Sequence, residues 1–321
     1  MNYAFLRSMK FDIITIGGAT EDVALNTKDG VLLDNKNYLL RQKLLAFEYG
    51  AKVDIEKAFF SFGGGAANVA VSSSLLGLKT AIIAAVGDDN SAKSIVKNLK
   101  DRGVDVSLVK EVRDISSGLS FLLVGEDNEH IVFSARGANS HLEISEKDLK
   151  NLRKTEWIFI SSLSGEWQDC LEKVFSLEAK IAWNPGHVQL KKGISGIGKY
   201  LKNTKVLILN KDEATELVLS HKKYKDQDGD FFNDINNILS ALKSFGPEIA
   251  VVTNGHSGAH AHDGKEFYFQ PAIKEKRRVD TTGVGDAFGS SFVAGLKIYQ
   301  GDIRKAMFLG ARNTSSVVSI H

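Results

Sequence analysis

The sequence Val279-Asp280-Thr281-Thr282-Gly283-Val284-Gly285-Asp286-Ala287-Phe288-Gly289 places a Gly-x-Gly turn directly before a segment with helical spacing. That segment carries apolar side chains on one side, at Phe292, Val293, Leu296 and Ile298. The amides of such a turn converge at the start of a helix, whose partial positive charge favours an anion such as a phosphoryl group. We expect Asp286 to face the same space, where it would take a proton from an attacking hydroxyl. Considered alone, Asp286 is equally well explained as a residue that stabilises the helix start.

Six short apolar runs, each ending on small or polar residues, indicate buried parallel strands. They cover residues 11–16, 81–86, 157–160, 181–183, 206–209 and 249–252. Between them lie helix-length segments, at residues 66–76, 91–99, 171–177 and 235–242. This alternation predicts an α/β protein with a central, mostly parallel sheet that is covered by helices on both faces. Ligands of such sheets bind at the carboxyl ends of the strands, so the polar strand endings are the expected place of the chemistry.

Two segments, residues 23–60 and 113–136, break the alternation. The second is typical of a hairpin, because apolar residues 119–124 and 130–133 flank the turn Gly125-Glu126-Asp127-Asn128. We expect both segments to form one small β-sheet lid, split in sequence and joined in space. The large α/β domain then comprises residues 9–22, 61–112 and 137–321.

The composition excludes several classes of protein. Lys plus Arg number 41 and Asp plus Glu 39, and the formal net charge of +2 is too even for a protein that binds nucleic acid through bulk charge. The single cysteine, Cys170, excludes an internal disulfide and multi-cysteine zinc sites, and it fits a reducing compartment. No run of 18 apolar residues predicts a membrane span, and residues 1–10 lack the features of a secretion signal. We therefore expect a cytoplasmic protein that acts without nucleic acid or membrane.

Three further groups of residues lie where chemistry is expected. Gly63-Gly64-Gly65 permits close approach to the backbone, and Asn68 offers a donor and an acceptor one helical turn later. Asn210 and Glu213 follow a strand end, where an amide suits a phosphate and a carboxylate suits a hydrated Mg²⁺ ion. Asp22 also follows a strand end. Each group has a purely structural alternative: a Gly-rich helix start, an N-cap and a solvated turn residue.

These motifs together resemble the ribokinase (PfkB) family of carbohydrate and nucleoside kinases. Residues 279–289 look like the C-terminal signature of that family, and Phe62-Gly63-Gly64-Gly65-Ala66-Ala67-Asn68-Val69-Ala70 looks like its N-terminal signature. Other matching segments follow in the family's order: Leu76-Gly77, Val86-Gly87-Asp88-Asp89, Asn210-Lys211-Asp212-Glu213 and Thr253-Asn254-Gly255. The resemblance extends from about residue 11 to the end. It implies a three-layer α/β/α ribokinase-like sandwich with a small β-sheet lid.

On the nucleotide side, the resemblance implies that Asp286 is the catalytic base. The backbone of Gly283, Val284 and Gly285 would form the anion hole for the γ-phosphoryl group of ATP. Asn210 and Glu213 would lie near the phosphates, with Glu213 holding water on Mg²⁺. Thr253 and Gly255 would border the nucleotide.

On the acceptor side, the resemblance implies four residues that hold sugar hydroxyls: Asp22, Gly64, Gly65 and Asn68. Many members of the family have Lys where this chain has Gly65, so their substrates do not transfer directly. Asp280 and Thr282 match positions near a monovalent-cation site. The rest of that site comes from further along the chain, and this sequence stops at His321, so K⁺ activation and a short additional tail both stay open.

The prediction is ATP- and Mg²⁺-dependent phosphorylation of a primary hydroxyl of a small sugar, such as ribose, fructose or a keto-deoxy sugar. Alternatives are a nucleoside acceptor such as adenosine and a non-catalytic ligand binder that kept the fold. A nucleoside would need lid aromatics, for which the candidates are Tyr38, Phe47, Tyr49, Phe59 and Phe60. A phosphosugar would need cations, for which the candidates are Arg41, Lys43 and Arg136. Lids pair in several relatives, so a homodimer through the lid is an option.

Overall fold

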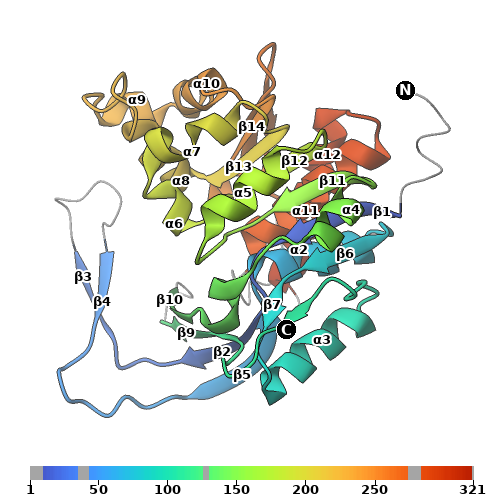
Figure 1. Ribbon diagram of the computed structural model, residues 1–321. Coiled ribbons are helices and arrows are strands. Elements are labelled where there is room, and N and C mark those ends of the chain that lie inside the picture. Colours follow the sequence, from blue (N-terminus) through green and yellow to red (C-terminus); the bar gives the residue numbers. More distant parts are fainter. Residues whose placement is uncertain (1–9, 35–42, 126–129, 274–282, 320–321) are drawn as a thin grey trace.

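The computed structural model describes residues 10–34, 43–125, 130–273 and 283–319. Six parallel strands form most of an eight-stranded sheet, in the spatial order β6-β1-β11-β12-β13-β14. Their bounds are β1 Phe11–Ile16, β6 Thr80–Ile83, β11 Thr155–Ile160, β12 Lys180–Trp183, β13 Val206–Asn210 and β14 Ile249–Thr253. They correspond to the six apolar runs of the sequence, so the predicted parallel sheet is confirmed. Two antiparallel strands, β15 (Ala259–His262) and β16 (Phe267–Gln270), extend the sheet beyond β14 (Figure 1).

One predicted strand is shorter than expected. The run 81–86 leaves the sheet after Ile83, because the neighbouring β1 ends at Ile16 and offers no further partner. Ala84 instead accepts a hydrogen bond from the amide of Lys110, and β7 (Ala85–Val86) pairs with β8 (Lys110–Glu111). The chain therefore turns from the main sheet towards the small sheet at this point.

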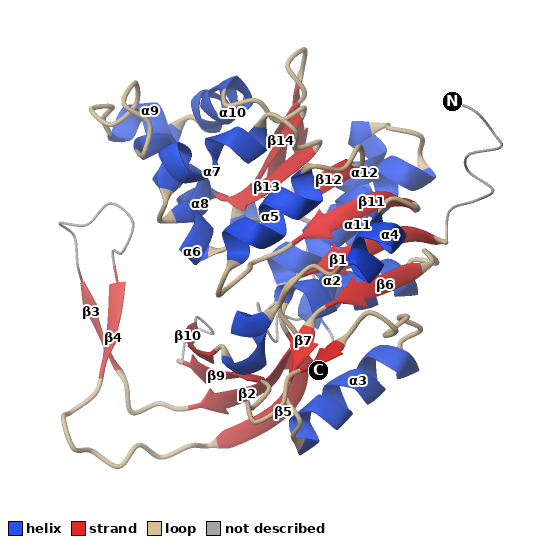
Figure 2. Ribbon diagram, viewed as in Figure 1, coloured by secondary structure: helices blue, strands red, loops and turns tan. Residues whose placement is uncertain are grey.

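Helices cover both faces of the main sheet, as Figure 2 shows. Alternate residues of the buried strands belong to different cores: Ile13 and Phe159 pack with one helix layer, Ile14 and Ile158 with the other. The first layer contains α2 (Gly65–Leu75), α3 (Asn90–Asp101), α11 (Val284–Ile298) and α12 (Ile303–Ser319). The second contains α4 (Glu146–Leu152), α5 (Trp167–Phe175), α6 (His187–Leu190), α7 (Gly193–Leu201), α8 (Lys211–Leu219), α9 (Gly229–Asn233) and α10 (Ile235–Ser244). The fold is the expected three-layer α/β/α sandwich.

A second, four-stranded sheet lies beside the main one, in the order β10-β9-β2-β5. Its strands are β2 Thr20–Asn26, β5 Lys57–Gly63, β9 Gly118–Val124 and β10 His130–Ala135. A small extra sheet is therefore present as expected, but β2 begins at Thr20 and β5 ends at Gly63, outside the segment 23–60. Two further strands, β3 (Val31–Asp34) and β4 (Lys43–Ala46), form a separate hairpin that extends away from it (Figure 1).

The two faces of this small sheet differ in chemistry. Side chains paired across the strands share a face. One row is polar and consists of Ser61, Asp22, Ser120 and Ser134; the adjacent row on the other face is apolar and consists of Phe60, Val23, Phe121 and Phe133. Asp22 lies close enough to Asp286 of α11 for their charges to interact, so the polar row faces the body of the protein. On the other face Val23 is buried and Phe60 is 74% exposed.

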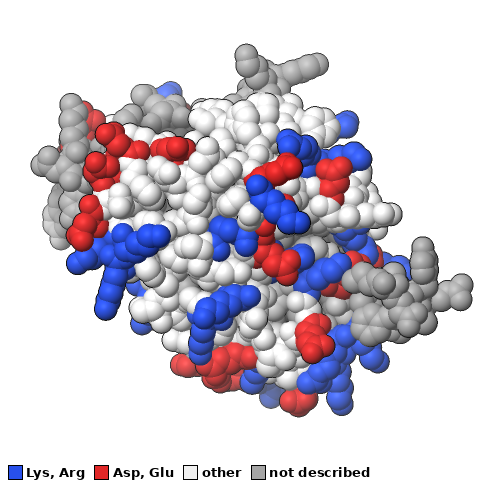
Figure 3. Space-filling view, turned by 90° about the horizontal axis from the view of Figure 1, so that it is seen from above, with Lys and Arg blue, Asp and Glu red and all other residues white. Residues whose placement is uncertain are grey.

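Charge is evenly spread on the face shown in Figure 3. Lys and Arg side chains lie there among Asp and Glu side chains and uncharged surface, and neither sign gathers in one patch. Among the described helices, none is long and apolar enough to cross a membrane.

Candidate active site

The turn before α11 has the backbone shape that the sequence predicts. Gly283 is the N-cap of α11 and has the left-handed φ of 72°, which favours glycine. The helix begins at Val284, so Asp286 lies in its first turn, where backbone amides have no acceptor within the helix. A Cβ atom on Gly283 would lie 3.3 Å from Nδ2 of Asn68. The turn therefore packs against α2, the helix that carries Asn68.

Asn68 holds the Asp286 side chain in place. Its Nδ2 donates a hydrogen bond to Oδ2 of Asp286, with a length of 2.9 Å, although 218 residues separate the two in sequence. Burial raises the pKa of Asp286 to about 6, and the negative charge of Asp22 adds to the rise, while the Asn68 hydrogen bond opposes it. Asp286 is thus a stronger base than an ordinary aspartate and still ionised at pH 7.

The Gly-rich turn brings the small sheet against the same point. A Cβ on Gly63 would lie 1.9 Å from Oδ2 of Asp22, so only glycine lets that carboxylate approach. A Cβ on Gly65 would lie 2.9 Å from the Ser161 side chain and 3.6 Å from Oδ1 of Asp286. Ser161 thus occupies the space into which a side chain at position 65 would extend.

Asp22 is held by its own strand. Thr20, the first residue of β2, donates a hydrogen bond of 2.7 Å from Oγ1 to Oδ1 of Asp22. Gly64, the N-cap of α2, packs against the backbone of Gly18 and Ala19, which leads into the same strand. Of the four residues expected on the acceptor side, Asp22, Gly65 and Asn68 lie close to Asp286, and Gly64 is the N-cap of the helix that carries Asn68.

Asn210 and Glu213 cap α8 reciprocally. The amide of Glu213 donates to Oδ1 of Asn210 at 2.8 Å, and the amide of Asn210 donates to Oε2 of Glu213 at 2.9 Å. The capping alternative considered for these residues is therefore realised. Burial raises the pKa of Glu213 to about 7, the Asn210 amide opposes the rise, and the charges of Asp286, Asp212 and Glu216 add to it. Asp212 and Glu216 belong to α8 itself, whereas Asp286 comes from α11, so the cap alone does not explain why Asp286 lies nearby.

Two cavities meet at the start of α11. The first, about 540 Å³ and partly open to solvent, is lined by Asn184, Ile208, Leu209, Asn210, Glu213, Thr253, Gly283, Val284, Gly285 and Asp286. The second, about 740 Å³, has a more apolar wall, which includes Gly255, Ala259, Ala272, Phe288, Ala311 and Thr314. They share Thr253, Val284 and Gly285, so they form one continuous cleft. It opens at the carboxyl ends of β12, β13 and β14, as expected for a parallel sheet.

Sequence reasoning missed several residues of this cleft. Asn184 lines it, and its Nδ2 donates a 2.8 Å hydrogen bond to the carbonyl of Ile208; its signal was its place at the end of an apolar run. Phe288 lies within the signature of residues 279–289 but was not singled out, and Ala311 and Thr314 match no motif. Of the expected residues, Asp280 and Thr282 lie outside the described residues, as does Arg41. Arg136 is exposed.

The donor set of the first cavity suits a magnesium ion that arrives with a nucleotide. Glu213 and Asp286 line this cavity, and no basic side chain is among its described lining residues. Two carboxylates would repel phosphates unless a cation accompanied them. Mg²⁺ keeps water ligands and binds through one or two carboxylates plus substrate phosphates. Within the described ranges, no cluster of three or more His, Cys, Asp or Glu could hold a metal by itself.

Comparison with known proteins agrees with this geometry. A model of the pfkB family of carbohydrate kinases matches residues 30–319. An ATP-dependent ribose-1-phosphate kinase of Halopiger xanaduensis is 27% identical over 77% of each chain, and a 5-dehydro-2-deoxygluconokinase of Shouchella clausii is 24% identical over 100% of this chain and 94% of its own. A ribokinase of Cryptococcus neoformans, solved with ADP, superposes with a TM-score of 0.77 at 18% identity, over 96% of this chain and 94% of that one.

The fold and the cleft thus define a ribokinase-like phosphotransferase. The chain belongs to the pfkB family of carbohydrate kinases and is an ATP-dependent kinase of that class. The resemblance inferred from the motifs is confirmed.

Proposed function

We propose that this kinase transfers the γ-phosphoryl group of ATP to a primary hydroxyl of a small sugar, with Asp286 as the base. The observation that carries the proposal is the place of Asp286. It shares a cavity wall with Gly283, Val284 and Gly285, and its other side is bonded to Asn68 and neighbours Asp22. The carboxylate therefore stands between the anion-binding turn and the residues suited to hydroxyls.

Asp286 would accept the proton of the acceptor hydroxyl as its oxygen attacks. The raised pKa of about 6 suits this role, because a base works best when its pKa lies near the working pH. The Asn68 amide keeps one carboxylate oxygen oriented, which leaves the other free to meet the hydroxyl.

The first turn of α11 would stabilise the charge on the migrating phosphoryl group. Its amides at Val284 and Gly285 have no acceptor within the helix and point along the helix axis, where the helix dipole adds positive charge. Phosphoryl transfer needs positioning and electrostatic stabilisation more than covalent catalysis, and this arrangement supplies that type of stabilisation.

The nucleotide would lie along the continuous cleft. The apolar cavity beside Gly255 and Phe288 suits a base, and the cavity with Asn210 and Thr253 suits the phosphates. Mg²⁺, when bound, would neutralise phosphate charge. Glu213 would hold it through water, and its own raised pKa would fall as the cation approaches.

The acceptor class is tested with a panel assayed for ADP release. The panel contains ribose, fructose, a keto-deoxy sugar acid, ribose 1-phosphate, inosine and adenosine. A sugar should give the highest kcat/KM, and Asp286→Asn should abolish release while leaving ATP binding nearly intact. Background release with every compound would contradict the proposal.

One observation keeps a nucleoside acceptor as a second candidate. Phe59 is 54% exposed and lies on the same face of the small sheet as Asp22, two residues along β5 from its partner Ser61. An aromatic ring on that face suits stacking on a base. Higher kcat/KM for inosine or adenosine than for every sugar would decide for it. Phe60, by contrast, faces away.

The outward face supports a homodimer through the lid, which we take to comprise residues 23–60 and 113–136. Phe60, Phe121 and Phe133 are 74%, 41% and 55% exposed and lie in one row across the sheet. In a two-fold symmetric dimer, this row would pack against the same row of a second copy of the chain. Sedimentation analysis should give a dimer for the parent chain and a monomer for Phe133→Asp; a parent monomer would contradict the pairing.

A further inference from the structure

The side chain of Asn139 makes an unusual pair of contacts outside the cleft. Asn139 lies in the short 3-10 helix η1 (Gly137–His141) and is only 6% exposed. Its Oδ1 accepts a hydrogen bond from the amide of Ala19 at 3.1 Å, and its Nδ2 donates to the carbonyl of Ala19 at 3.0 Å. One side chain thus pairs with both backbone groups of a single residue, as a neighbouring strand would.

Ala19 is the point where the chain crosses from the main sheet to the small one. It lies between β1 and β2 and is fully buried. The carbonyl of the preceding Gly18 accepts the amides of Ala66 and Ala67, the first residues inside α2, at 3.2 and 3.3 Å. The crossing is therefore held from one side by the helix that carries Asn68 and from the other side by Asn139.

A second strand of the small sheet closes over the same amide. A Cβ on Gly118, the first residue of β9, would lie 2.1 Å from Nδ2 of Asn139. Gly118 pairs with Thr20, whose hydroxyl is bonded to Asp22. Asn139 therefore sits at the common start of the two central strands of the lid.

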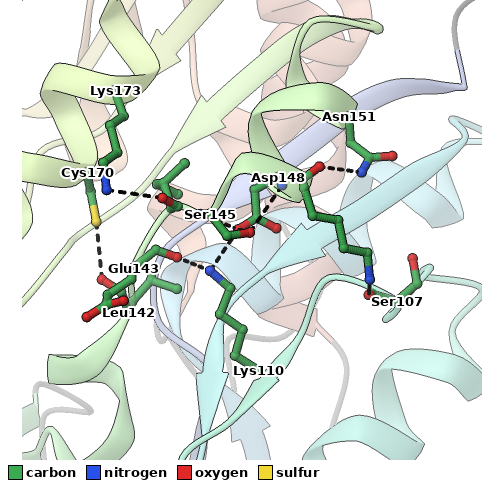
Figure 4. Close-up of polar contacts among 11 residues, drawn as sticks. Ser107, Lys110, Leu142, Glu143, Ser145, Asp148, Asn151, Cys170 and Lys173 are labelled. Carbon is green, nitrogen blue, oxygen red and sulfur yellow. Dashed lines mark hydrogen bonds and ion pairs between the residues drawn. The ribbon is translucent and has the colours of Figure 1, made fainter.

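The segment that follows Asn139 is fastened by other contacts, shown in Figure 4. Lys110 forms a 2.7 Å ion pair with Asp148 and also bonds the carbonyl of Glu143. Cys170 and Lys173 donate to the carbonyls of Leu142 and Ile144, each at 3.2 Å. The Asn139 side chain is thus not needed to hold its own segment, and its two hydrogen bonds act on Ala19.

We propose that Asn139 is a positioning residue that fixes Thr20 and Asp22 opposite Asn68 and Asp286, and so sets the geometry of acceptor binding. This inference rests on the proposed role of Asp22 in holding the acceptor. A shift of one residue at the crossing would move Asp22 relative to Asp286, and small misplacements of reacting groups lower transfer strongly.

The test compares Asn139→Leu with Gly118→Ala, whose methyl group would displace the Asn139 amide and also contact Thr20 and Ala19, and with their double variant. Lys110→Met is the matched control, because it loosens the following segment and leaves Ala19 untouched. KM is measured separately for ATP and for the panel compound that the parent chain phosphorylates fastest. Hydrogen exchange of the amides of residues 17–26 is followed without any ligand.

Both Asn139→Leu and Gly118→Ala should raise the acceptor KM about tenfold and leave the ATP KM within about twofold. The double variant should be no worse than Gly118→Ala alone, because both changes break the contact of Asn139 with Ala19. Exchange of the amides of residues 17–26 should accelerate in these variants and not in Lys110→Met. An unchanged acceptor KM with unchanged exchange, or equal effects in Lys110→Met, would overturn the inference.

Asp22→Asn separates this inference from the function on which it rests. If Asp22→Asn raises the acceptor KM and Asn139→Leu does not, the positioning role fails alone. If Asp22→Asn leaves that KM unchanged, the acceptor role of Asp22 fails, and the exchange data then decide whether Asn139 still fixes the crossing.

Discussion

Partly buried carboxylates have opposite surroundings at the two edges of the central sheet. At the carboxyl edge, Asp286 and Glu213 line a cavity with no basic side chain among its described lining residues, and the pKa of each is raised. At the amino edge, Glu156, the second residue of β11, lies beside two lysines. Burial works against its charge there too, but hydrogen bonds from Lys297 and Lys180 outweigh it and lower its pKa.

The amino edge is a neutralised network. Lys297, at the end of α11, bonds Glu156 and also lies 3.2 Å from Asp12 of β1. Lys180 of β12 adds a 3.0 Å contact to Glu156. The network joins three strands and one helix, which is a structural role.

The difference separates carboxylates that lysines neutralise from carboxylates that line the cleft. The same helix, α11, ends in a lysine that neutralises carboxylates and begins with an aspartate that lies among other carboxylates. A carboxylate whose charge is not compensated lowers the stability of the fold. Its presence in the cleft therefore points to a function in which a bound ligand or ion supplies the compensating charge. The predictions below test this contrast.

The largest effect is expected for Asp286→Asn. Loss of the base should lower kcat by about 10³-fold, with the Kd for ATP nearly unchanged. The same change should raise Tm by about 3 °C at pH 8, because it removes a carboxylate whose folded-state pKa is raised. This gain should vanish near pH 4, where the parent aspartate is protonated in the folded state. Single-turnover kinetics and thermal unfolding measure the two effects, and a loss of Tm together with kcat would mean a structural role.

At the amino edge, Lys297→Met should do the reverse. It should cost about 2 kcal/mol of unfolding free energy, less than a fully buried pair, because the Lys297 side chain keeps 23% of its exposure. Both KM values should stay unchanged. The contribution of Glu156 to the free energy of unfolding should be complete at pH values above its ordinary pKa of about 4.3. It should disappear as the pH falls through the lowered pKa that Glu156 has in the folded protein. Urea unfolding at pH 7 and pH 3 measures this; a changed acceptor KM would show that the edges are not independent.

A smaller effect is expected for Glu213→Gln. Glutamine can still accept the amide of Asn210, so the α8 cap should be retained. Tm at pH 8 should not fall, because the change removes a carboxylate whose folded-state pKa is raised. The Mg²⁺ concentration for half-maximal activity should rise about tenfold. Asp212→Asn, on the exposed side of the same turn, is the matched control and should behave as the parent chain. Equal Mg²⁺ dependence of all three proteins would remove Glu213 from the metal site.

Much of the site could be predicted because its residues are local. The six apolar runs define the sheet, and the Gly-x-Gly turn with Asp286 defines the helix start, since each depends only on neighbours in sequence. Asn210 and Glu213 are also close in sequence, so their role as a helix cap could be predicted from the sequence together with their proposed functional role.

The rest depends on contacts between distant segments. Asn139 matters because it bonds Ala19, 120 residues away, and no periodicity encodes that bond. The end of β6 at Ile83 depends on where β1 stops, and the wall formed by Ala311 and Thr314 depends on how α12 packs on α11. The network of Lys297 with Glu156 and Asp12 has the same origin.

The central claim is that Asp286 is the group that deprotonates the acceptor, and the pH dependence of single-turnover transfer tests it most directly. In a Glu213→Gln background, which removes the other titrating carboxylate, the rate should fall about tenfold per pH unit below about 6. Asn68→Ala removes a bond that favours the ionised form, so the fall should begin at higher pH; Asp22→Asn removes a negative charge, so it should begin at lower pH. A rate that stays constant from pH 5 to 8, or an acid limb that neither variant moves, would contradict the claim.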